Sequence, residues 1–212
     1  MNPKKEYYEK QAATIIKNLA KRRMEGFYCA TAEEAKEKVM SMIEAGTSVS
    51  FGGSMTLEEC GVMEAVRSRS DITLYDRAAA KSPEEVGRIY RQAFSVDTYL
   101  MSTNAITLDG ELINIDGRGN RVAALIFGPE KVIIVAGMNK VANSEADGLL
   151  RVRNMAAPPN CVRLNKKTPC SVTGRCGDCY GDESICSQIV VTRRSSDLNR
   201  IKVILVGEEL GY

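Results

Sequence analysis

The stretch TSVSFGGSMTLEECGVMEAVRS, residues 47–68, is the part of the sequence that best indicates the fold. Its first half is a short apolar run ending in two glycines, which is typical of a buried strand that leads into a tight turn. Its second half carries apolar residues at helical spacing, and Thr56 and Glu59 stand three residues apart, as in a capping box at a helix start. We therefore expect a strand, a loop and a helix here.

The same alternation of strand and helix patterns continues along the chain on both sides of this stretch. Helices are predicted at 4–24, 31–46, 82–94, 120–128 and 144–156, and strands at 27–30, 71–76, 131–137, 187–194 and 200–208. The helix at 144–156 is expected to end before Pro158 and Pro159, because proline interrupts a helix interior. Between two β-rich runs, Asp109 and Gly110 form the dipeptide that suits a tight type I′ hairpin turn.

This order of elements predicts an α/β fold, a three-layer sandwich whose mostly parallel sheet is covered by helices on both faces. The β-hairpin is expected as an antiparallel excursion from that sheet. We expect one domain over residues 1–212, with a Cys-rich segment at 158–186 inserted before the last strands.

Charge and hydropathy narrow the range of partners. The chain has 29 Lys and Arg against 27 Asp and Glu, a net charge of +2, so no broad basic surface for nucleic acid is expected. The N-terminal residues are charged and interrupted, and no segment approaches the roughly 18 to 20 apolar residues that a membrane span requires. We expect a cytoplasmic protein.

The sequence contains no histidine. Mechanisms that use an imidazole base, such as Ser-His-Asp and Cys-His pairs, are therefore excluded. Zinc sites with histidine ligands are excluded for the same reason, so a bound metal would need thiolates, carboxylates, backbone groups or a ligand from outside the chain.

Four of the seven cysteines lie in TPCSVTGRCGDCYGDESIC, residues 168–186: Cys170, Cys176, Cys179 and Cys186. Cys176 and Cys179 are separated by two residues, a spacing with which two thiolates bind one metal ion or one cluster. An odd number of cysteines in a reducing compartment disfavours a disulfide framework. The pattern predicts a 4Fe–4S cluster, with a structural zinc and a metal-free or redox-switching loop as alternatives.

The other three cysteines are expected to differ from these four. Cys29 and Cys60 lie in apolar patterns, where a free cysteine is usually a small buried hydrophobe. Cys161 precedes the cluster by nine residues and is interpreted either as a spare thiol or as a fifth one.

Three polar, glycine-bearing loops follow predicted strands, at 50–56, 102–121 and 136–144. In open α/β sheets the ends of strands converge on one pocket, and small residues with free N–H groups there suit an anion. A plainer interpretation of each loop is a tight turn satisfied by its own side chains, or a solvated loop residue in the case of Lys140.

At these residues the chain resembles the LUD domain, named for lactate utilisation. The resemblance rests on SFGGSMTLEECGVMEAVR, on STNAITLDGELINIDGRGNRVAALIFGPEKVIIVAGMNKV, on RVRNMAAPPNCVRL, and on TPCSVTGRCGDC with the later Cys186. It implies the fold shared by glucosamine-phosphate deaminase, ribose-phosphate isomerase and CoA transferases (NagB/RpiA/CoA-transferase-like). Better-known members belong to bacterial systems that oxidise lactate with iron-sulfur partners.

Carried over by position, the resemblance also implies a ligand pocket. Its residues are Gly52, Gly53, Ser54, Thr56, Asn104, Thr107, Asp116, Asn120, Asn139 and Lys140. No catalytic residue is assigned by the resemblance.

Three functions follow from these patterns. The first is a redox or electron-transfer accessory in organic-acid oxidation, with a small anionic or carboxylate ligand, iron-sulfur proteins as partners, and a second copy of the chain as a further expected partner. The second is an isomerase-like or CoA-transferase-like enzyme in which Lys140 or a carboxylate, Asp109, Asp116, Glu58 or Glu59, acts as acid or base. The third is a binding module with a structural zinc.

Overall fold

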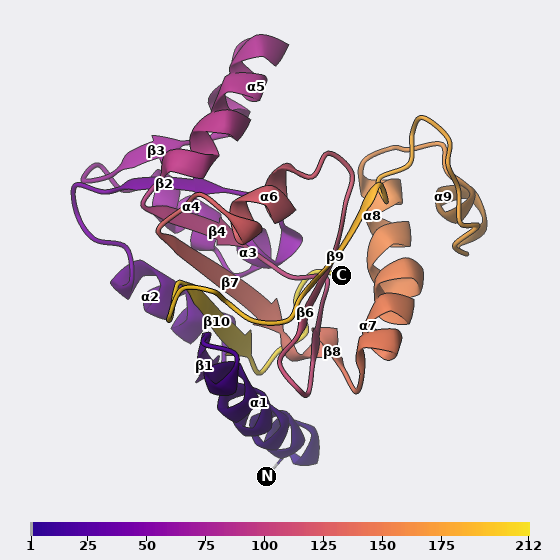
Figure 1. Ribbon diagram of the computed structural model, residues 1–212, viewed down its shortest axis with the longest axis horizontal. Coiled ribbons are helices and arrows are strands. Elements are labelled where there is room, and N and C mark those ends of the chain that lie inside the picture. Colours follow the sequence, from indigo (N-terminus) through magenta and orange to yellow (C-terminus); the bar gives the residue numbers. More distant parts are fainter. Residues whose placement is uncertain (1) are drawn as a thin grey trace.

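The computed structural model describes residues 2–212, and within them six parallel strands form a central sheet (Figure 1). Their order across the sheet is β1, β10, β7, β4, β2 and β3. The strands span Glu25–Cys29 (β1), Ile201–Val206 (β10), Lys131–Gly137 (β7), Thr98–Met101 (β4), Ser48–Phe51 (β2) and Thr73–Tyr75 (β3). The α/β class expected from the alternating pattern is confirmed.

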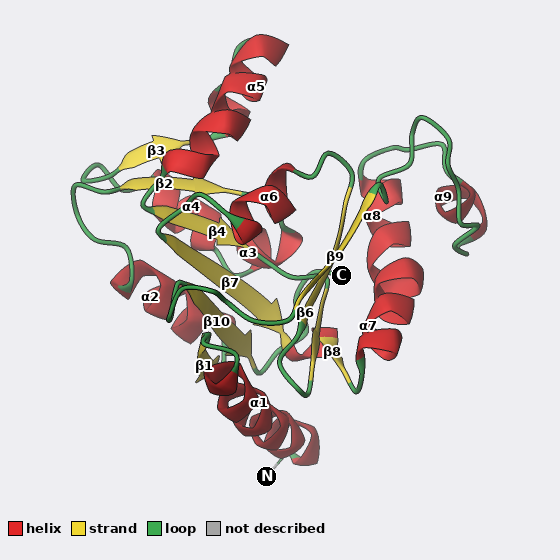
Figure 2. Ribbon diagram, viewed as in Figure 1, coloured by secondary structure: helices red, strands yellow, loops and turns green. Residues whose placement is uncertain are grey.

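Both faces of the central sheet are covered, as strand β7 shows (Figure 2). Val132 and Ile134 face a core shared with helices α1 and α6, whereas Ile133 and Val135 face a core shared with α2, α3 and α4. These helices span Pro3–Lys21 (α1), Asn120–Ile126 (α6), Ala32–Ser41 (α2), Met55–Glu59 (α3) and Val62–Arg67 (α4). A strand buried on both faces needs a continuous apolar run, which is why KVIIVAG stands out in the sequence.

A second, smaller sheet holds the hairpin, which the sequence predicts as an antiparallel excursion from the parallel sheet. In the described residues its order is β8, β5, β6 and β9, which span Val141–Ala142, Ala105–Thr107, Leu112–Asp116 and Gln188–Thr192. Strands β5 and β6 are antiparallel, and Gly110 in their turn has φ +89°. Both faces of the hairpin are buried: Ile106 faces the α1 core, whereas Ile113 packs against the helix that follows β8.

The predicted helix starts are correct at Thr31 and Ser82, whose side chains accept from the backbone N–H of Glu34 and Glu85. The capping box of Thr56 and Glu59 is wrong. Ser54 caps α3 instead by accepting from the Leu57 N–H at 3.3 Å.

The predicted single helix after Ser54 is also interrupted. Gly61 has φ +69° and separates α3 from α4, because this left-handed conformation ends a helix and suits glycine.

The long helix of the second half passes the two prolines that were expected to end it. Helix α7 (Glu145–Arg151) continues through a π-helical turn, η4 (Val152–Ala156), into α8 (Ala157–Arg163). Pro158 lies in the first turn of α8, a position at which proline is tolerated. The wide π turn lets the chain begin a new α segment without leaving the helix axis.

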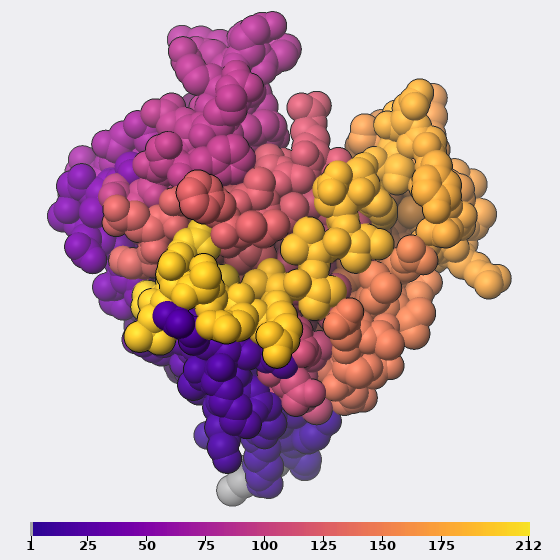
Figure 3. Space-filling model, viewed as in Figure 1, coloured from indigo at the N-terminus to yellow at the C-terminus, as the bar shows by residue number. Residues whose placement is uncertain are grey.

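The remaining helices lie at the periphery. Helix α5 (Pro83–Gln92) projects beyond the β3 edge, and short 3₁₀ turns cover Arg77–Ala79 (η1), Ala93–Ser95 (η2) and Met138–Lys140 (η3). After α8, residues 164–187 form a loop with one short helix, α9 (Pro169–Thr173), before the chain returns as β9. Figure 3 shows this segment, in orange, standing out at one edge of the molecule.

Candidate functional site

A cleft lies where strands of the central sheet end, between η1, α6, the π turn and α8. Its volume is about 320 Å³. A smaller cavity of about 90 Å³ continues it toward Lys140, because the two share the lining residues Gly53, Asn104, Ile115, Arg121, Ala156, Asn160 and Arg163. Ligands of parallel α/β sheets bind at this edge, beyond the carboxyl ends of the strands.

Lys140 forms the floor of the smaller cavity. It follows β7 directly in η3, and only 3% of its surface is exposed. Its Nζ donates to Thr56 Oγ1 at 2.7 Å and to Ser102 Oγ at 3.0 Å. Burial, together with the positive charges of Arg151 and Arg121, lowers the pKa of Lys140 to about 7.

Arg121, from α6, ties the wall of the cleft together. Its Nη1 donates to Ser102 O at 3.0 Å and to Asn114 Oδ1 at 2.6 Å. Its Nη2 donates to Asn104 Oδ1 at 2.9 Å and to Ile115 O at 2.8 Å. Its Nε lies 3.4 Å from Asp116 Oδ2. The protein itself therefore occupies all five guanidinium donors, which makes Arg121 a structural support of the cleft rather than a free ligand donor.

The cleft carries an excess of positive charge. Arg77, Arg118, Arg163 and Lys166 line it together with a single carboxylate, Asp116. Asp116 is already engaged, because it faces Arg121 and accepts the Gly119 N–H at 3.1 Å. An uncompensated cluster of cations in a partly enclosed cleft attracts an anionic ligand.

Gly53 allows one of these cations to lie on the backbone. A Cβ at this position would come within 2.2 Å of Arg77 Nη2, and the other end nitrogen, Nη1, donates to Tyr90 Oη at 3.0 Å. The second glycine of the strand-ending pair therefore lets a guanidinium approach the β2–α3 loop closely.

The structure brings seven of the ten pocket residues expected from the sequence to this cleft or its small cavity. They are Gly53, Ser54, Thr56, Asn104, Asp116, Asn120 and Lys140. Their roles in ligand binding stay predictions.

The other three expected pocket residues lie behind the cleft wall or away from it. Gly52 backs onto Arg121 and Tyr99, and Thr107 donates to Glu111 Oε2 within the hairpin. Asn139 holds the C-terminal segment, accepting from the Leu210 N–H at 3.1 Å.

The carboxylates proposed as acid or base are also separated. Asp109, Glu58 and Glu59 are exposed and do not line the cleft, which leaves Asp116 as the one proposed carboxylate at the cleft within the described chain.

The sequence interpretation missed the arginines of the site and Ser102. Arg77, Arg121 and Arg163 come from three segments distant in the chain, and arginine is common on protein surfaces, so no local pattern distinguishes them. The one usable signal was at Arg121, a charged residue in the otherwise apolar helix NRVAALI. Ser102 directly follows β4, a position that favours pocket residues.

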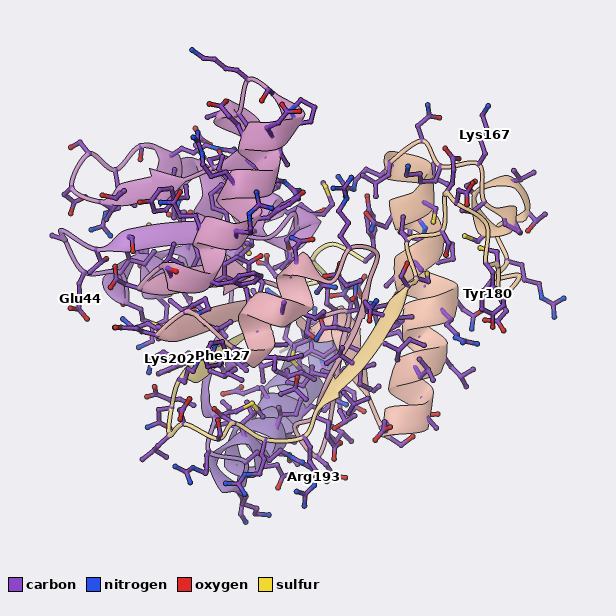
Figure 4. All side chains as sticks on the ribbon, turned by 45° about the horizontal axis from the view of Figure 1, so that its top comes forward. Glu44, Phe127, Lys167, Tyr180, Arg193 and Lys202 are labelled. Carbon is purple, nitrogen blue, oxygen red and sulfur yellow. The ribbon has the colours of Figure 1, made fainter. Side chains whose placement is uncertain are left out.

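A second cavity, of about 520 Å³, lies between the 164–187 segment and α8. Five of the chain's cysteines line it: Cys161, Cys170, Cys176, Cys179 and Cys186. Figure 4 shows Lys167 and Tyr180 on the outer side of this segment, with sulfur atoms between it and α8. Cys161 is therefore a fifth thiol of the group, and it is almost fully buried. Cys29 and Cys60, in contrast, are buried in the core between the sheet and α2–α4, as expected.

The thiols of this cavity influence one another electrostatically. Burial, followed by the proximity of the other four thiols, raises the pKa of Cys186 to about 11. Burial also raises the pKa of Cys161, with Cys170 adding to the shift and Thr168 opposing it. Cys161 and Cys186 are therefore protonated at neutral pH unless a cation is bound beside them.

The arrangement of the thiols bears on which metal they suit. Across residues 2–212, no three His, Cys, Asp or Glu side chains are gathered closely enough to coordinate a single metal ion. The cysteines surround a cavity instead of meeting at one point. A four-iron cluster binds each thiolate at a different iron, so its ligands are more widely spaced than those of one tetrahedral zinc. An all-thiolate donor set is suited to both groups.

The cysteine cavity and the cationic cleft adjoin. Ile115, Ala157 and Ile185 line both, and Ile115 also lines the Lys140 cavity. One β6 side chain and the start of α8 thus separate the two regions.

Within the described residues, no helix combines the length and apolar composition needed to cross a membrane.

The chain was compared with known proteins and structures. A crystal structure of a DUF162 family protein from Deinococcus radiodurans is similar at 13% identity and a TM-score of 0.52, covering 95% of this chain and 98% of that chain. The structure of eIF2B delta from Chaetomium thermophilum aligns at 16% identity and a TM-score of 0.34, covering 54% of this chain and 49% of the other. No curated protein matched the sequence.

The Deinococcus structure supports the fold over nearly the full length of both chains. The family comparison matches the LUD domain at residues 12–206, a range that includes the cleft, Lys140 and all five thiols of the cysteine cavity. The chain therefore belongs to the LUD domain family.

Proposed function

We propose that this LUD-domain protein is a redox or electron-transfer accessory of organic-acid oxidation, with a 4Fe–4S cluster in the cysteine cavity and a small carboxylate in the cleft. The observation that carries the proposal is the contact between two unlike sites: a cavity lined by five thiols shares Ile115, Ala157 and Ile185 with a cationic cleft. The resemblance to lactate-utilisation proteins supports a hydroxy or keto acid as the carboxylate.

The proposed ligands of the cluster are Cys170, Cys176, Cys179 and Cys186. All four come from the 164–187 segment, a loop with one short helix, so their sulfurs can adjust to a cluster more readily than side chains held in the sheets. Cys161 is held in helix α8 and is the most buried thiol of the group, which suits a neighbour that shields the cluster. A bound 4Fe–4S cluster supplies one-electron transfer, and iron-sulfur partner proteins would donate or accept that electron.

The chain's own residues have two tasks in this proposal. The thiols must lose their protons on metal binding, so loading releases protons and weakens as the pH falls. The cations of the cleft, Arg77 and Arg163 among them, bind and orient the carboxylate beside the shared wall.

The deciding experiment is anaerobic purification followed by iron, sulfide and zinc analysis and an absorption spectrum. The proposal expects about four irons and four sulfides per chain and a brown protein whose absorption bleaches on reduction. Cys→Ala variants at 170, 176, 179 and 186 should lose iron, whereas Cys161→Ala, the matched control in the same cavity, should keep it. A colourless, iron-free protein with one tightly bound zinc contradicts the redox function.

A second candidate function is an enzyme whose cleft carries out chemistry on an anionic substrate, with zinc as a structural element. The observation that favours it is Lys140, a buried amine on the floor of a cavity, with a pKa near neutrality. Crystals soaked with phosphosugars, CoA esters or lactate test it: a ligand bound against Lys140 supports an enzyme, and an empty cleft in every soak argues against one.

A further inference from the structure

Lys140 is a buried titratable group that electron transfer leaves without a role. Its two hydrogen-bond partners are hydroxyls, Thr56 and Ser102, rather than carboxylates. A charged ammonium buried among neutral groups is unfavourable, whereas a neutral amine is well accommodated there.

The hydrogen bonds around Lys140 can be followed proton by proton. Thr56 Oγ1 donates to Leu210 O at 3.3 Å, and Ser102 Oγ donates to Thr103 O at 3.3 Å. Both hydroxyl oxygens are thereby free to accept from Nζ. A neutral amine has two N–H groups, and both are used in this way, which leaves its lone pair available to a molecule in the cavity that Lys140 lines.

The charges around Nζ keep a substantial fraction of it neutral at physiological pH. Arg151 from α7 and Arg121 from α6 add to the effect of burial, whereas Glu59 from α3 and the neighbouring Cys60 oppose it. The net result, a pKa near 7, is the condition under which a lysine acts as a nucleophile.

The space next to the amine suits a small molecule with an anionic group. The cavity of about 90 Å³ corresponds to roughly three water molecules of liquid volume and opens into the larger cationic cleft. Asn104, Asn160 and Arg163 line both spaces, so an anionic group bound there stays close to Nζ.

We propose that Nζ of Lys140 forms an imine with a small aldehyde or ketone that carries a carboxylate or phosphate group. The amine lone pair attacks the carbonyl carbon, the C–O π bond breaks, and a proton passes from nitrogen to oxygen to give a carbinolamine. The remaining N–H proton leaves nitrogen as that oxygen gains a second proton, water departs, and a C=N bond remains, so amine plus carbonyl gives imine plus water with no change of oxidation state. The inference rests on the cleft of the proposed function and is independent of the cysteine cavity.

The test is reductive trapping on the full chain, with pyruvate in one arm and dihydroxyacetone phosphate in the other, each with sodium cyanoborohydride. The expected result in one arm or both is a single adduct per chain, which peptide mapping places on Lys140. With pyruvate, the mass gain equals one pyruvate less one oxygen atom. Whether the adduct forms with pyruvate or with dihydroxyacetone phosphate shows whether the site prefers a carboxylate or a phosphate group.

Two variants control the experiment. Lys140→Met should abolish the adduct, and Lys131→Met, at the start of the strand that precedes η3, should retain it. Thr56→Val keeps the amine and removes one hydrogen-bond acceptor, so it should slow trapping severalfold without abolishing it. A circular dichroism spectrum like that of the parent and a cooperative thermal unfolding transition establish that each variant is folded.

The outcomes separate this inference from the proposed function. Calorimetric binding of pyruvate or of dihydroxyacetone phosphate without any adduct overturns the imine and leaves the anion-binding cleft standing. Labelling that persists in Lys140→Met, or spreads over surface lysines, also overturns it. Iron and sulfide content is measured separately from trapping, so a protein without an iron-sulfur cluster would still test the imine.

Discussion

The Lys140 cavity and the cysteine cavity adjoin, yet they are built in opposite ways. Lys140, Arg121 and Asn104 are held by networks of hydrogen bonds from the ends of buried strands. Cys176 and Cys179 lie half-exposed on a loop with a single short helix. The comparison teaches that hydrogen bonds within the fold position the first site, whereas the thiols of the second lie largely on a loop, where a bound group such as the proposed cluster would have to gather them.

The largest effect on the free energy of unfolding is expected from removing Arg121, the buried side chain that holds the wall of the cleft together. Arg121→Ala leaves Asp116, Asn114 and two backbone carbonyls without their partner, so we expect a loss of about 3–5 kcal/mol in the free energy of unfolding. Urea titration followed by circular dichroism measures it. Arg121→Lys should recover little, since one amine cannot serve five acceptors. An alanine variant within about 0.5 kcal/mol of the parent contradicts the assigned role.

The second effect is the contribution of Lys140 to the pH dependence of the free energy of unfolding. Its folded pKa, about 7, lies below the ordinary 10.5, so the unfolded chain binds more protons between these values and stability rises with pH there. Relative to Lys140→Met, the parent should gain about 1.4 kcal/mol per pH unit between pH 7.5 and 10. Urea titrations of both proteins across this range check it. Parallel curves for the two mean that Lys140 is not buried in the neutral form.

A smaller effect concerns binding rather than stability. Arg77→Gln should weaken pyruvate or phosphate binding about tenfold, because a charge-assisted hydrogen bond is lost from the cleft. Its free energy of unfolding should stay within about 0.5 kcal/mol of the parent. Isothermal calorimetry compares it with Arg91→Gln, an exposed arginine of α5 that does not line the cleft and should bind normally. Equal losses in both variants indicate a general charge effect.

The smallest effect on the free energy of unfolding is expected from substitutions in the cysteine segment. It tests whether this segment is packed less tightly than the Lys140 cavity. In metal-free protein, Cys179→Ala should change the free energy of unfolding by less than about 0.5 kcal/mol, because the thiol is half-exposed on a loop. Cys161→Ala, which empties a buried position in α8, should cost about 1 kcal/mol or more. Similar costs for the two show that the segment packs as tightly as the core.

Much of the fold was predictable because it depends on local periodicity. The run KVIIVAG and the caps at Thr31 and Ser82 each carry their own signal, and each has the expected structure. The hairpin turn also falls at Gly110, but it is not the expected type I′ turn, because Asp109 lacks the positive φ that this type requires. The errors occur where two local rules compete. Pro158 was expected to end the helix, but a π turn lets the helix continue past it. Thr56 was expected to cap the helix start, but Ser54, two residues earlier, provides the cap.

The site was less predictable than the fold. Seven expected pocket residues do lie at the cleft, since glycines and small polar residues after strands indicate a pocket edge. Asn139 follows a strand equally well, but its side chain turns to the backbone of Leu210 and Gly211. A residue's position in sequence fixes the loop that carries it, whereas the direction of its side chain depends on segments far along the chain.

The sequence by itself determined the α/β alternation, the absence of any imidazole chemistry and the grouping of four cysteines, because each is a property of composition or short spacing. Only the tertiary structure decided that Cys161 joins those four, that Arg77 and Arg163 converge on one cleft, and that Lys140 is buried beside two hydroxyls. These features arise from long-range packing of strand ends and helices. Burial and proximity, which shift pKa values and concentrate charge, come into existence only when distant segments meet.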